Sequence, residues 1–299
     1  MTIAFVFAGQ GVQKVGMGTD LLPQAPYKEI FSKLDDNLQN IIIEGPKEDL
    51  DNTLNAQPAI VATSLGIANI LKSKGIEADY VAGLSLGEYS ALAYSGVLSL
   101  EDTLEIVKKR GQIMADALPQ GTTGMLAVMN ADLEKINEVV ASLDNLQIAN
   151  YNSPKQIVLT GSLESIDRAV ELFKEQKIRA IKLNVSGAFH SDYLVGASEE
   201  LYSVLKNYNF NETNKKVVYN TLGTESDEEV ASLLKNQIKS SVRFMQSVEY
   251  MIENGVDTFV EIGPGKVLSG LIKQINSNVK IYNIESEKSI DDLVEELNV

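Results

Sequence analysis

The sequence has 299 residues but no cysteine, and its only histidine is His190. Without cysteine, disulfides, thiolate metal sites and thiol catalysis are excluded. Any acid–base chemistry by an imidazole must therefore use His190. No apolar run approaches the ~20 residues of a membrane span, and the chain enters a strand-like segment at once, without a basic leader. These absences favour a cytoplasmic protein that does not contact a membrane.

Basic residues are also scarce: the sequence has 26 Lys and Arg but 41 Asp and Glu, which gives a net charge of −15. Such a charge argues against nucleic acid and anionic membranes as partners. It would also repel an anionic substrate, so a substrate of that kind needs a local basic site. The hydrophobic content of 44% is typical of a globular protein, with room for one large domain or two smaller ones.

The stretch 81–89 reads as a strand, a tight turn and the start of a helix, with Ser85 at the bend. Its G-x-S-x-G pattern in this context is typical of a nucleophile elbow. Gly83 and Gly87 fit a strained turn in which a Cβ would clash with the backbone. The helix start directs its amides towards the Ser85 oxygen, so the Leu86 amide would stabilise an oxyanion. The alternative is an ordinary turn serine between two glycines.

The helix predicted from Ser99 to about Leu118 has one charged residue on its apolar stripe, Arg110. A guanidinium among apolar neighbours is costly unless it is paired or faces a cleft. A side chain that extends to solvent and a structural salt bridge are two possible explanations. The third is a site that binds a carboxylate or phosphate, which suits the geometry of arginine. The expected buried stripe consists of Leu100, Leu104, Val107, Gly111 and Met114.

Residues 122–187 follow the order βαββαβ, which is that of a ferredoxin-like unit. The expected strands are 125–129, 147–150, 156–161 and 179–185, with helices at 133–143 and 163–177 and a turn at 152–154. We expect this unit to be a small domain inserted into a larger one. The large domain is then formed by residues 1–121 and 188–299.

The large domain is expected to contain a main sheet with helices between its strands. The strand 3–7 leads into a glycine-containing loop, 8–13, whose backbone could approach a ligand or the elbow, or could be a plain loop. Further strands are expected at 79–83, 217–220, 258–262 and 279–284, and helices at 57–74, 86–95, 192–207 and after the turn 263–268, with a C-terminal helix capped by Ser289.

His190 lies where the chain re-enters the large domain, at a strand-to-helix junction marked by Gly187. Two interpretations stay open from this position alone. One is a structural histidine, and the other is a base for the serine of the elbow.

Several segments together resemble one family, the malonyl-CoA:acyl-carrier-protein transacylases, along essentially the whole chain. The order and spacing of these segments are more specific than any one of them. The matching segments are 7–11, 83–88, 110–111, 150–154, 187–191 and 261–268. The fold expected is α/β, a large α/β-hydrolase-like domain with an inserted ferredoxin-like domain.

The resemblance implies a role for individual residues. Ser85 would be the nucleophile and His190 its general base, a dyad in which a backbone carbonyl, here that of Gln237, holds the other imidazole nitrogen. Arg110 would bind the malonyl carboxylate. The oxyanion hole would consist of the backbone amides of Gln10 and Leu86, and the residues expected near the site are Asn150 and Asn152.

Two positions next to the dyad are informative within the family. Leu84 stands where many relatives carry histidine, and activity is expected to survive because that side chain is not the base. Phe189 resembles the malonyl-selective members, whereas members that take branched units often carry serine there.

The resemblance implies malonyl-CoA and acyl carrier protein as partners, ping-pong chemistry without cofactor or metal, and a monomer. Carrier protein is acidic, so docking needs a local basic patch, for which Lys266 is a candidate. Three different functions stay open beside this one. They are a transferase that loads a polyketide synthase in trans, a serine thioesterase and a non-catalytic binding protein.

Overall fold

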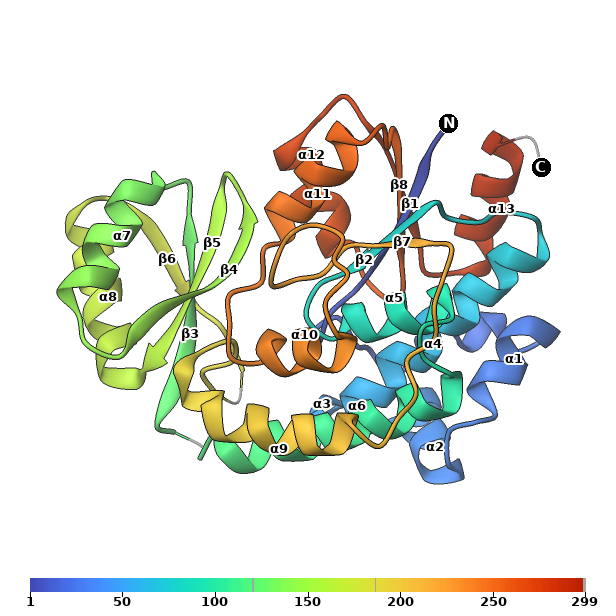
Figure 1. Ribbon diagram of the computed structural model, residues 1–299, viewed down its shortest axis with the longest axis horizontal. Coiled ribbons are helices and arrows are strands. Elements are labelled where there is room, and N and C mark those ends of the chain that lie inside the picture. The colour runs from blue at the N-terminus through green and yellow to red at the C-terminus, as the bar shows by residue number, and fades with distance from the viewer. Residues whose placement is uncertain (120, 186, 298–299) are drawn as a thin grey trace.

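The computed structural model describes residues 1–119, 121–185 and 187–297, and it has a mixed α/β architecture with two β-sheets (Figure 1). The strands are β1 (Ile3–Phe7), β2 (Tyr80–Gly83), β3 (Thr123–Met129), β4 (Leu146–Ser153), β5 (Gln156–Ser162), β6 (Arg179–Lys182), β7 (Lys216–Val217), β8 (Thr258–Ile262) and β9 (Lys280–Ile284). The helices of the first half are η1 (Thr19–Leu21), α1 (Ala25–Phe31), α2 (Asp36–Glu44), α3 (Lys47–Asp51), α4 (Thr53–Ser73), α5 (Gly87–Ser95), α6 (Leu100–Ala117) and α7 (Leu133–Ser142). Those of the second half are α8 (Leu163–Glu175), η2 (Asp192–Leu194), α9 (Val195–Leu205), α10 (Val230–Gln237), α11 (Phe244–Glu253), α12 (Val267–Ile275) and α13 (Glu287–Leu297).

The larger sheet has five parallel strands in the order β7-β2-β1-β8-β9. Successive residues of its strands face two separate cores, as the period of two requires. Phe5 and Phe7 pack into the core with α4, α5 and α6, whereas Ala4 and Val6 pack into the core with α11 and α12. Because the strands are parallel, their carboxyl ends lie at one edge of the sheet, where ligands of such sheets bind. The elbow follows β2 at this edge.

The smaller sheet is antiparallel, in the order β4-β5-β3-β6. Helices α7 and α8 cover one of its faces (Figure 1). Residues of the other face, such as Met125 and Val158, pack with Phe189. Strand β4 also joins the rest of the protein through the backbone, because Tyr151 N donates to Val242 O and Val242 N donates to Ala149 O, both at 2.8 Å.

The predicted strands 3–7 and 258–262 have the expected bounds, and the βαββαβ order is confirmed. The helix predicted from residue 57 begins one turn earlier, because Asn52 accepts a hydrogen bond from Leu54 N (3.0 Å) and caps it. This helix, α4, also corrects the expectation about apolar runs. It is long and apolar enough to cross a membrane, but 83% of that window is buried inside the protein. It is thus a core helix.

Other predicted boundaries were wrong. The strand 217–220 ends at Val217, the strand 179–185 ends at Lys182, and the turn 152–154 is partly strand, since β4 continues to Ser153. The helix 192–207 begins as the separate turn η2. Ser289 is not a cap but lies inside α13, and its N–H donates to Ser286 Oγ before the helix (3.4 Å). Helices α10 and α11 were not predicted.

Candidate active site

The elbow is built as the glycine pattern predicts. Ser85 has φ of 54°, in the left-handed region. A Cβ on Gly83 would lie 1.9 Å from Gly87 C, and one on Gly87 would lie 2.0 Å from Phe7 O. Neither position has room for a side chain, since the contacts are with backbone atoms that cannot give way. The two glycines therefore let the turn pass against β1 and against itself.

His190 and Ser85 are adjacent in space although 105 residues separate them, with His190 Nε2 2.8 Å from Ser85 Oγ. The other ring nitrogen, Nδ1, lies 2.8 Å from the backbone carbonyl of Gln237. A carbonyl only accepts, so Nδ1 carries the proton and Nε2 accepts from the Ser85 hydroxyl. Burial lowers the pKa of His190 to about 4, with the nearby Arg110 charge acting in the same direction. The imidazole is therefore neutral at pH 7, as a general base must be.

Arg110 is 1% exposed and reaches the same serine. Its Nη2 donates to Ser85 Oγ (3.1 Å) and to Gln237 Oε1 (3.2 Å), and its Nη1 donates to Gln57 Oε1 (3.0 Å). The Tyr89 ring lies 5.3 Å from the guanidinium carbon. Over residues 1–119, 121–185 and 187–297, no carboxylate forms a salt bridge with Arg110. Burial excludes extension to solvent, and no structural salt bridge is present among these residues, so of the three predicted explanations a site for a carboxylate or phosphate stays open.

The loop that carries Gln10 lies directly against the elbow. A Cβ on Gly9 would lie 2.6 Å from Leu84 O, so the close approach expected of this loop is to the elbow. The Gln10 side chain is fixed by Thr53 Oγ1 (3.1 Å) and Gln57 Nε2 (3.3 Å). Among the hydrogen bonds of the described chain, none has the backbone N–H of Gln10 or Leu86 as its donor.

Ser85, His190 and Arg110 line one cleft of about 680 Å³, a size typical of small-molecule sites. Both asparagines predicted near the site, Asn150 and Asn152, also line it. Asn152 Nδ2 donates to Gln156 Oε1 (2.7 Å), and its buried Oδ1 has no hydrogen-bond partner within the described residues. Other lining residues, from β3, β5, the segment after β6, the segment before η2 and α12, are Met125, Val158, Leu183, Val185, Phe189 and Val267.

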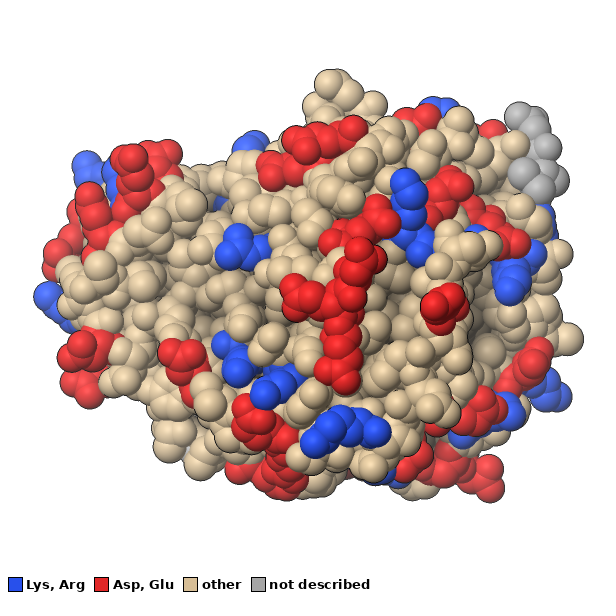
Figure 2. Space-filling view, in the orientation of Figure 1, with Lys and Arg blue, Asp and Glu red and all other residues tan. Residues whose placement is uncertain are grey.

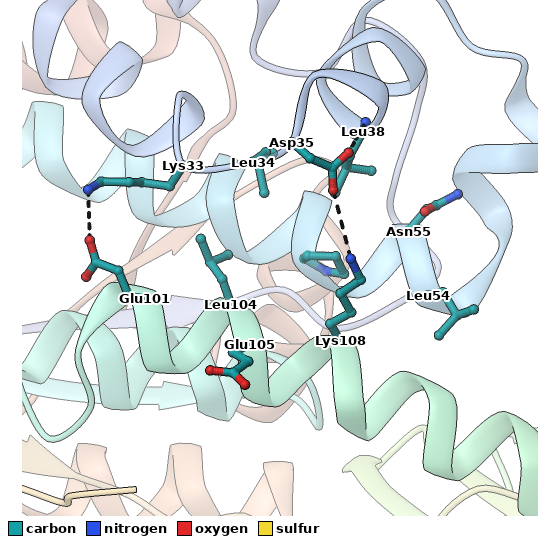
Figure 3. A pocket seen from close by; sticks show the side chains of 11 residues that line it. Lys33, Leu34, Asp35, Leu38, Leu54, Asn55, Glu101, Leu104, Glu105 and Lys108 are labelled. Carbon is teal, nitrogen blue, oxygen red and sulfur yellow. Dashed lines mark hydrogen bonds and ion pairs between the residues drawn. The ribbon is translucent and has the colours of Figure 1, made fainter.

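A second, smaller pocket of about 280 Å³ lies between α6, α4 and the α1–α2 segment (Figure 3). Its charged residues pair with one another across the rim, Lys33 with Glu101 at 2.8 Å and Lys108 with Asp35 at 3.9 Å. It has no nucleophile and no histidine among its lining residues. The larger cleft is therefore the candidate active site.

The surface reflects the net charge. On the face shown in Figure 2, acidic side chains form a band beside α10, with smaller groups of Lys and Arg around it. The acidic run 225–229 precedes α10 in the sequence. Lys266, the predicted docking residue, is exposed next to Val267, which lines the cleft.

Sequence reasoning missed the side chains that hold the elbow. Asn220 Oδ1 accepts from Ser85 N (2.7 Å), and Asn220 Nδ2 donates to Gly83 O (2.6 Å). Glu88 is 1% exposed and accepts from Asn220 N (2.8 Å). A carboxylate in the first turn of an otherwise apolar helix was a usable signal for Glu88. No local sequence signal marked Asn220, because its partners Ser85 and Gly83 are 135 and 137 residues away along the chain.

Comparison with known proteins agrees with this geometry. Residues 4–295 match the family model described as "Acyl transferase domain". The chain is 41% identical over 301 residues to the malonyl CoA-acyl carrier protein transacylase of Bacillus subtilis, covering 97% of this chain and 95% of that protein. The transacylase of the same name from Clostridium perfringens superposes with a TM-score of 0.96 at 40% identity, covering 100% and 98%. A malonyl-transacylase solved in complex with its type II PKS acyl-carrier protein gives a TM-score of 0.95 at 33% identity, covering 99% and 100%.

Proposed function

Because the chain belongs to the acyl transferase family, we propose that it transfers a malonyl group from coenzyme A to the phosphopantetheine thiol of acyl carrier protein. The observation that carries the proposal is the buried Arg110 guanidinium, 3.1 Å from Ser85 Oγ and without a salt-bridged carboxylate among the described residues. A malonyl group on Ser85 brings its own carboxylate, which a guanidinium binds with paired hydrogen bonds. The names of the relatives at about 40% identity support the same reaction.

In the first half-reaction, Ser85 Oγ attacks the thioester carbonyl while its proton moves to His190 Nε2. The oxyanion of the tetrahedral intermediate accepts hydrogen bonds from the amides of Gln10 and Leu86. The carbon–sulfur bond then breaks, and the coenzyme A sulfur takes the proton from His190. Malonyl-Ser85 and free coenzyme A result.

In the second half-reaction, the carrier thiol gives its proton to His190 and its sulfur attacks the ester. The same two amides stabilise the second oxyanion. Ser85 Oγ leaves and recovers the proton, so the enzyme is restored. Gln237 keeps the imidazole oriented through its carbonyl and holds Arg110 through its side chain. Every step uses groups of this chain and its two substrates, and we propose that no cofactor or metal takes part.

We propose that Asn150 and Asn152, which line the cleft, are polar contacts for the acyl group or the pantetheine arm. The orphaned Asn152 Oδ1 supports such a contact, since a buried acceptor without a partner is costly. Phe189 closes the same wall and would restrict the size of the acyl group.

The division into domains is also a proposal. All strands of the small sheet lie between Thr123 and Lys182, and all strands of the large sheet lie outside that segment, which supports a small domain at 122–187 and a large domain at 1–121 and 188–299. The βαββαβ order with antiparallel pairing supports the ferredoxin-like description. The large sheet has the order 3-2-1-4-5 in its own chain order, that of a doubly wound sheet. The feature that the large domain shares with α/β-hydrolases is therefore the nucleophile elbow. The end of the large domain, 298–299, lies outside the described residues.

We propose further that the protein acts as a monomer in the cytoplasm. Exposed Lys266 at the lip of the cleft is placed to meet an acidic carrier protein, which the acidic band beside α10 would repel.

A second candidate function is the loading of a polyketide carrier in trans, because one similar structure contains a type II PKS carrier protein. The chemistry is the same, so only the carrier distinguishes the two. The test is to incubate the enzyme with malonyl-CoA and an equimolar mixture of the two holo carriers, and to follow both by intact mass. Preferential malonylation of the fatty-acid carrier supports the proposal, and preference for the polyketide carrier favours the second candidate.

The same experiment distinguishes a transferase from a thioesterase and from a non-catalytic binding protein. Release of free malonate without carrier loading would indicate a thioesterase. Ser85→Ala should load neither carrier, and a wild type that neither loads a carrier nor releases malonate would indicate a non-catalytic protein.

A further inference from the structure

Ser85 has a backbone conformation that its neighbours must maintain. Left-handed φ values are sparsely populated by residues other than glycine, and they persist only where the surroundings fix them. Both backbone polar groups of Ser85 are tied to distant side chains. Its N–H donates to Asn220 Oδ1 (2.7 Å), and its carbonyl accepts from Gln237 Nε2 (2.9 Å).

Asn220 spans the elbow with its side-chain amide. While Oδ1 accepts from Ser85, Nδ2 donates to Gly83 O (2.6 Å), so one amide satisfies a donor and an acceptor on the two sides of Leu84. Asn220 is 1% exposed and lies two residues after Val218, whose N–H donates to Val81 O (2.9 Å). The Asn220 side chain thus continues the pairing beside β2 after the backbone of β7 has turned away. This also explains why the predicted strand 217–220 is short.

Glu88 in turn holds Asn220. Its Oε2 accepts from Asn220 N (2.8 Å), and the carboxyl is 1% exposed in the first turn of α5. Burial raises the pKa of Glu88 to about 7, opposed by the hydrogen bond from Asn220, by the Gln237 side chain and by the charge of Arg110. Within the described residues, no lysine or arginine forms a salt bridge with Glu88. Its hydrogen-bond partner among the described residues is Asn220, whose side chain holds the backbone of Ser85.

We infer that Glu88 and Asn220 are positioning residues for the acyl transfer, which hold Ser85 Oγ between His190 Nε2 and Arg110 Nη2. They touch neither the substrate nor the reacting atoms. If Asn220 is truncated, the Ser85 N–H loses its acceptor and φ can relax. That movement displaces Oγ from His190 and displaces the adjacent Leu86 amide, which is placed to bind the oxyanion.

The inference rests on the proposed function for the identity of the reaction, but its geometry concerns the serine alone. The first measurement is the split between kcat and KM for malonyl-CoA. We expect Asn220→Ala to lower kcat about 10²-fold, the cost of a misplacement of about 1 Å. KM should stay close to that of the wild type, since Arg110 keeps its contacts with Gln57 and Gln237. Asn220→Asp keeps the acceptor for Ser85 but has no donor for Gly83, so its kcat should lie between the two.

Glu88 has conservative and disruptive variants. Glu88→Gln retains the size and an acceptor oxygen, so kcat should stay near that of the wild type, whereas Glu88→Ala should lower it. The matched control is Glu261→Ala, which removes another buried carboxylate, whose hydrogen bonds within the described residues come from Leu268 N (2.9 Å) and Ser269 N (2.8 Å) at the start of α12. That control should lower Tm without changing kcat.

The second measurement is the rate at which phenylmethanesulfonyl fluoride modifies Ser85, followed by intact mass. In this reaction Oγ bonds to sulfur, fluoride leaves and the hydroxyl proton passes to His190, so the rate reports the serine without a malonyl group. We expect Asn220→Ala and Glu88→Ala to slow it in parallel with kcat. A folded Asn220→Ala protein with wild-type rates in both assays would overturn the inference. If Glu88→Gln were as slow as Glu88→Ala in both assays, Glu88 would not be a positioning residue. A wild type that is sulfonylated at Ser85 but transfers no malonyl group refutes the proposed function, and the sulfonylation rates still test the inference.

Discussion

Replacement of Arg110 by alanine should change which acyl group the enzyme accepts. The guanidinium is buried and makes its hydrogen bonds to Gln57, Gln237 and Ser85. In the acylation step it would exchange part of this set for the malonyl carboxylate. Loss of one partner of a buried, hydrogen-bonded charge pair costs about 3 kcal/mol, which corresponds to about 10²-fold in kcat/KM. Acetyl-CoA has no carboxylate, so its kcat/KM should be unchanged or higher.

The assay measures coenzyme A release with a thiol reagent, with malonyl-CoA or acetyl-CoA as donor and carrier protein as acceptor. Arg110→Lys is the matched control. It keeps the charge but cannot hold Gln57 and Gln237 while presenting two donors to a carboxylate, so its malonyl activity should lie between those of Arg110→Ala and the wild type. An equal loss with both donors would refute the reasoning, because Arg110 would then act on Ser85 and not on the carboxylate.

Three further predictions concern His190, the glycine Gly83 of the elbow, and Gln237, which contacts both His190 and Ser85. Because the pKa of His190 is lowered to about 4, its imidazole stays neutral well below pH 6.5. The value of kcat/KM should therefore stay level from pH 8 to about 5 and fall towards pH 4. A fall centred near pH 6.5 would contradict this. Gly83→Ala places a Cβ 1.9 Å from backbone and should lower Tm sharply, whereas Gly270→Ala, in open space within α12, should leave Tm equal or higher by calorimetry. Gln237→Ala keeps the carbonyl that holds His190 but loses the side-chain bonds to Ser85 and Arg110, so kcat/KM for malonyl-CoA should fall roughly tenfold. An unchanged value in steady-state kinetics would show that the side chain is dispensable.

The local parts of the site could be predicted from the sequence because their causes are local. The elbow depends on two glycines four residues apart, and the structure shows the backbone contacts that exclude side chains there. Arg110 was conspicuous because a charge interrupted an apolar helical stripe, and it is buried as that position requires. These patterns are properties of a few neighbouring residues.

The convergence of these parts could not be derived from local patterns. The contact between Ser85 and His190 spans 105 residues, and that between Arg110 and Gln237 spans 127. The resemblance to a family supplied the pairing of Ser85, His190 and Gln237. It gave no role to Asn220, whose side chain makes hydrogen bonds beside β2 where β7 has ended. Nor did it give a role to Gln57 of α4, whose side chain bonds to both Arg110 and Gln10.

The predicted ends of helices and strands were wrong where a side chain or a tertiary contact decides where the element ends. Asn52 caps α4 a turn before the expected start. At the start of α13, Ser289 N donates to Ser286 Oγ and Ser289 Oγ accepts from Ser286 N, so Ser289 lies inside the helix and Ser286 precedes it. Strand β7 ends at Val217, and the Asn220 side chain then continues the pairing beside β2. Pattern and propensity do not contain these contacts.

In the proposed reaction, Ser85 carries the malonyl group between coenzyme A and the carrier. The most direct test is the intact mass of the protein after brief exposure to malonyl-CoA without carrier protein, followed by peptide mapping. We expect a single malonyl adduct on Ser85 that is absent from Ser85→Ala and much weaker with acetyl-CoA. Addition of holo carrier protein should remove the malonyl group from Ser85. Carrier loading by Ser85→Ala, or an adduct that maps to another residue, would contradict this role of Ser85.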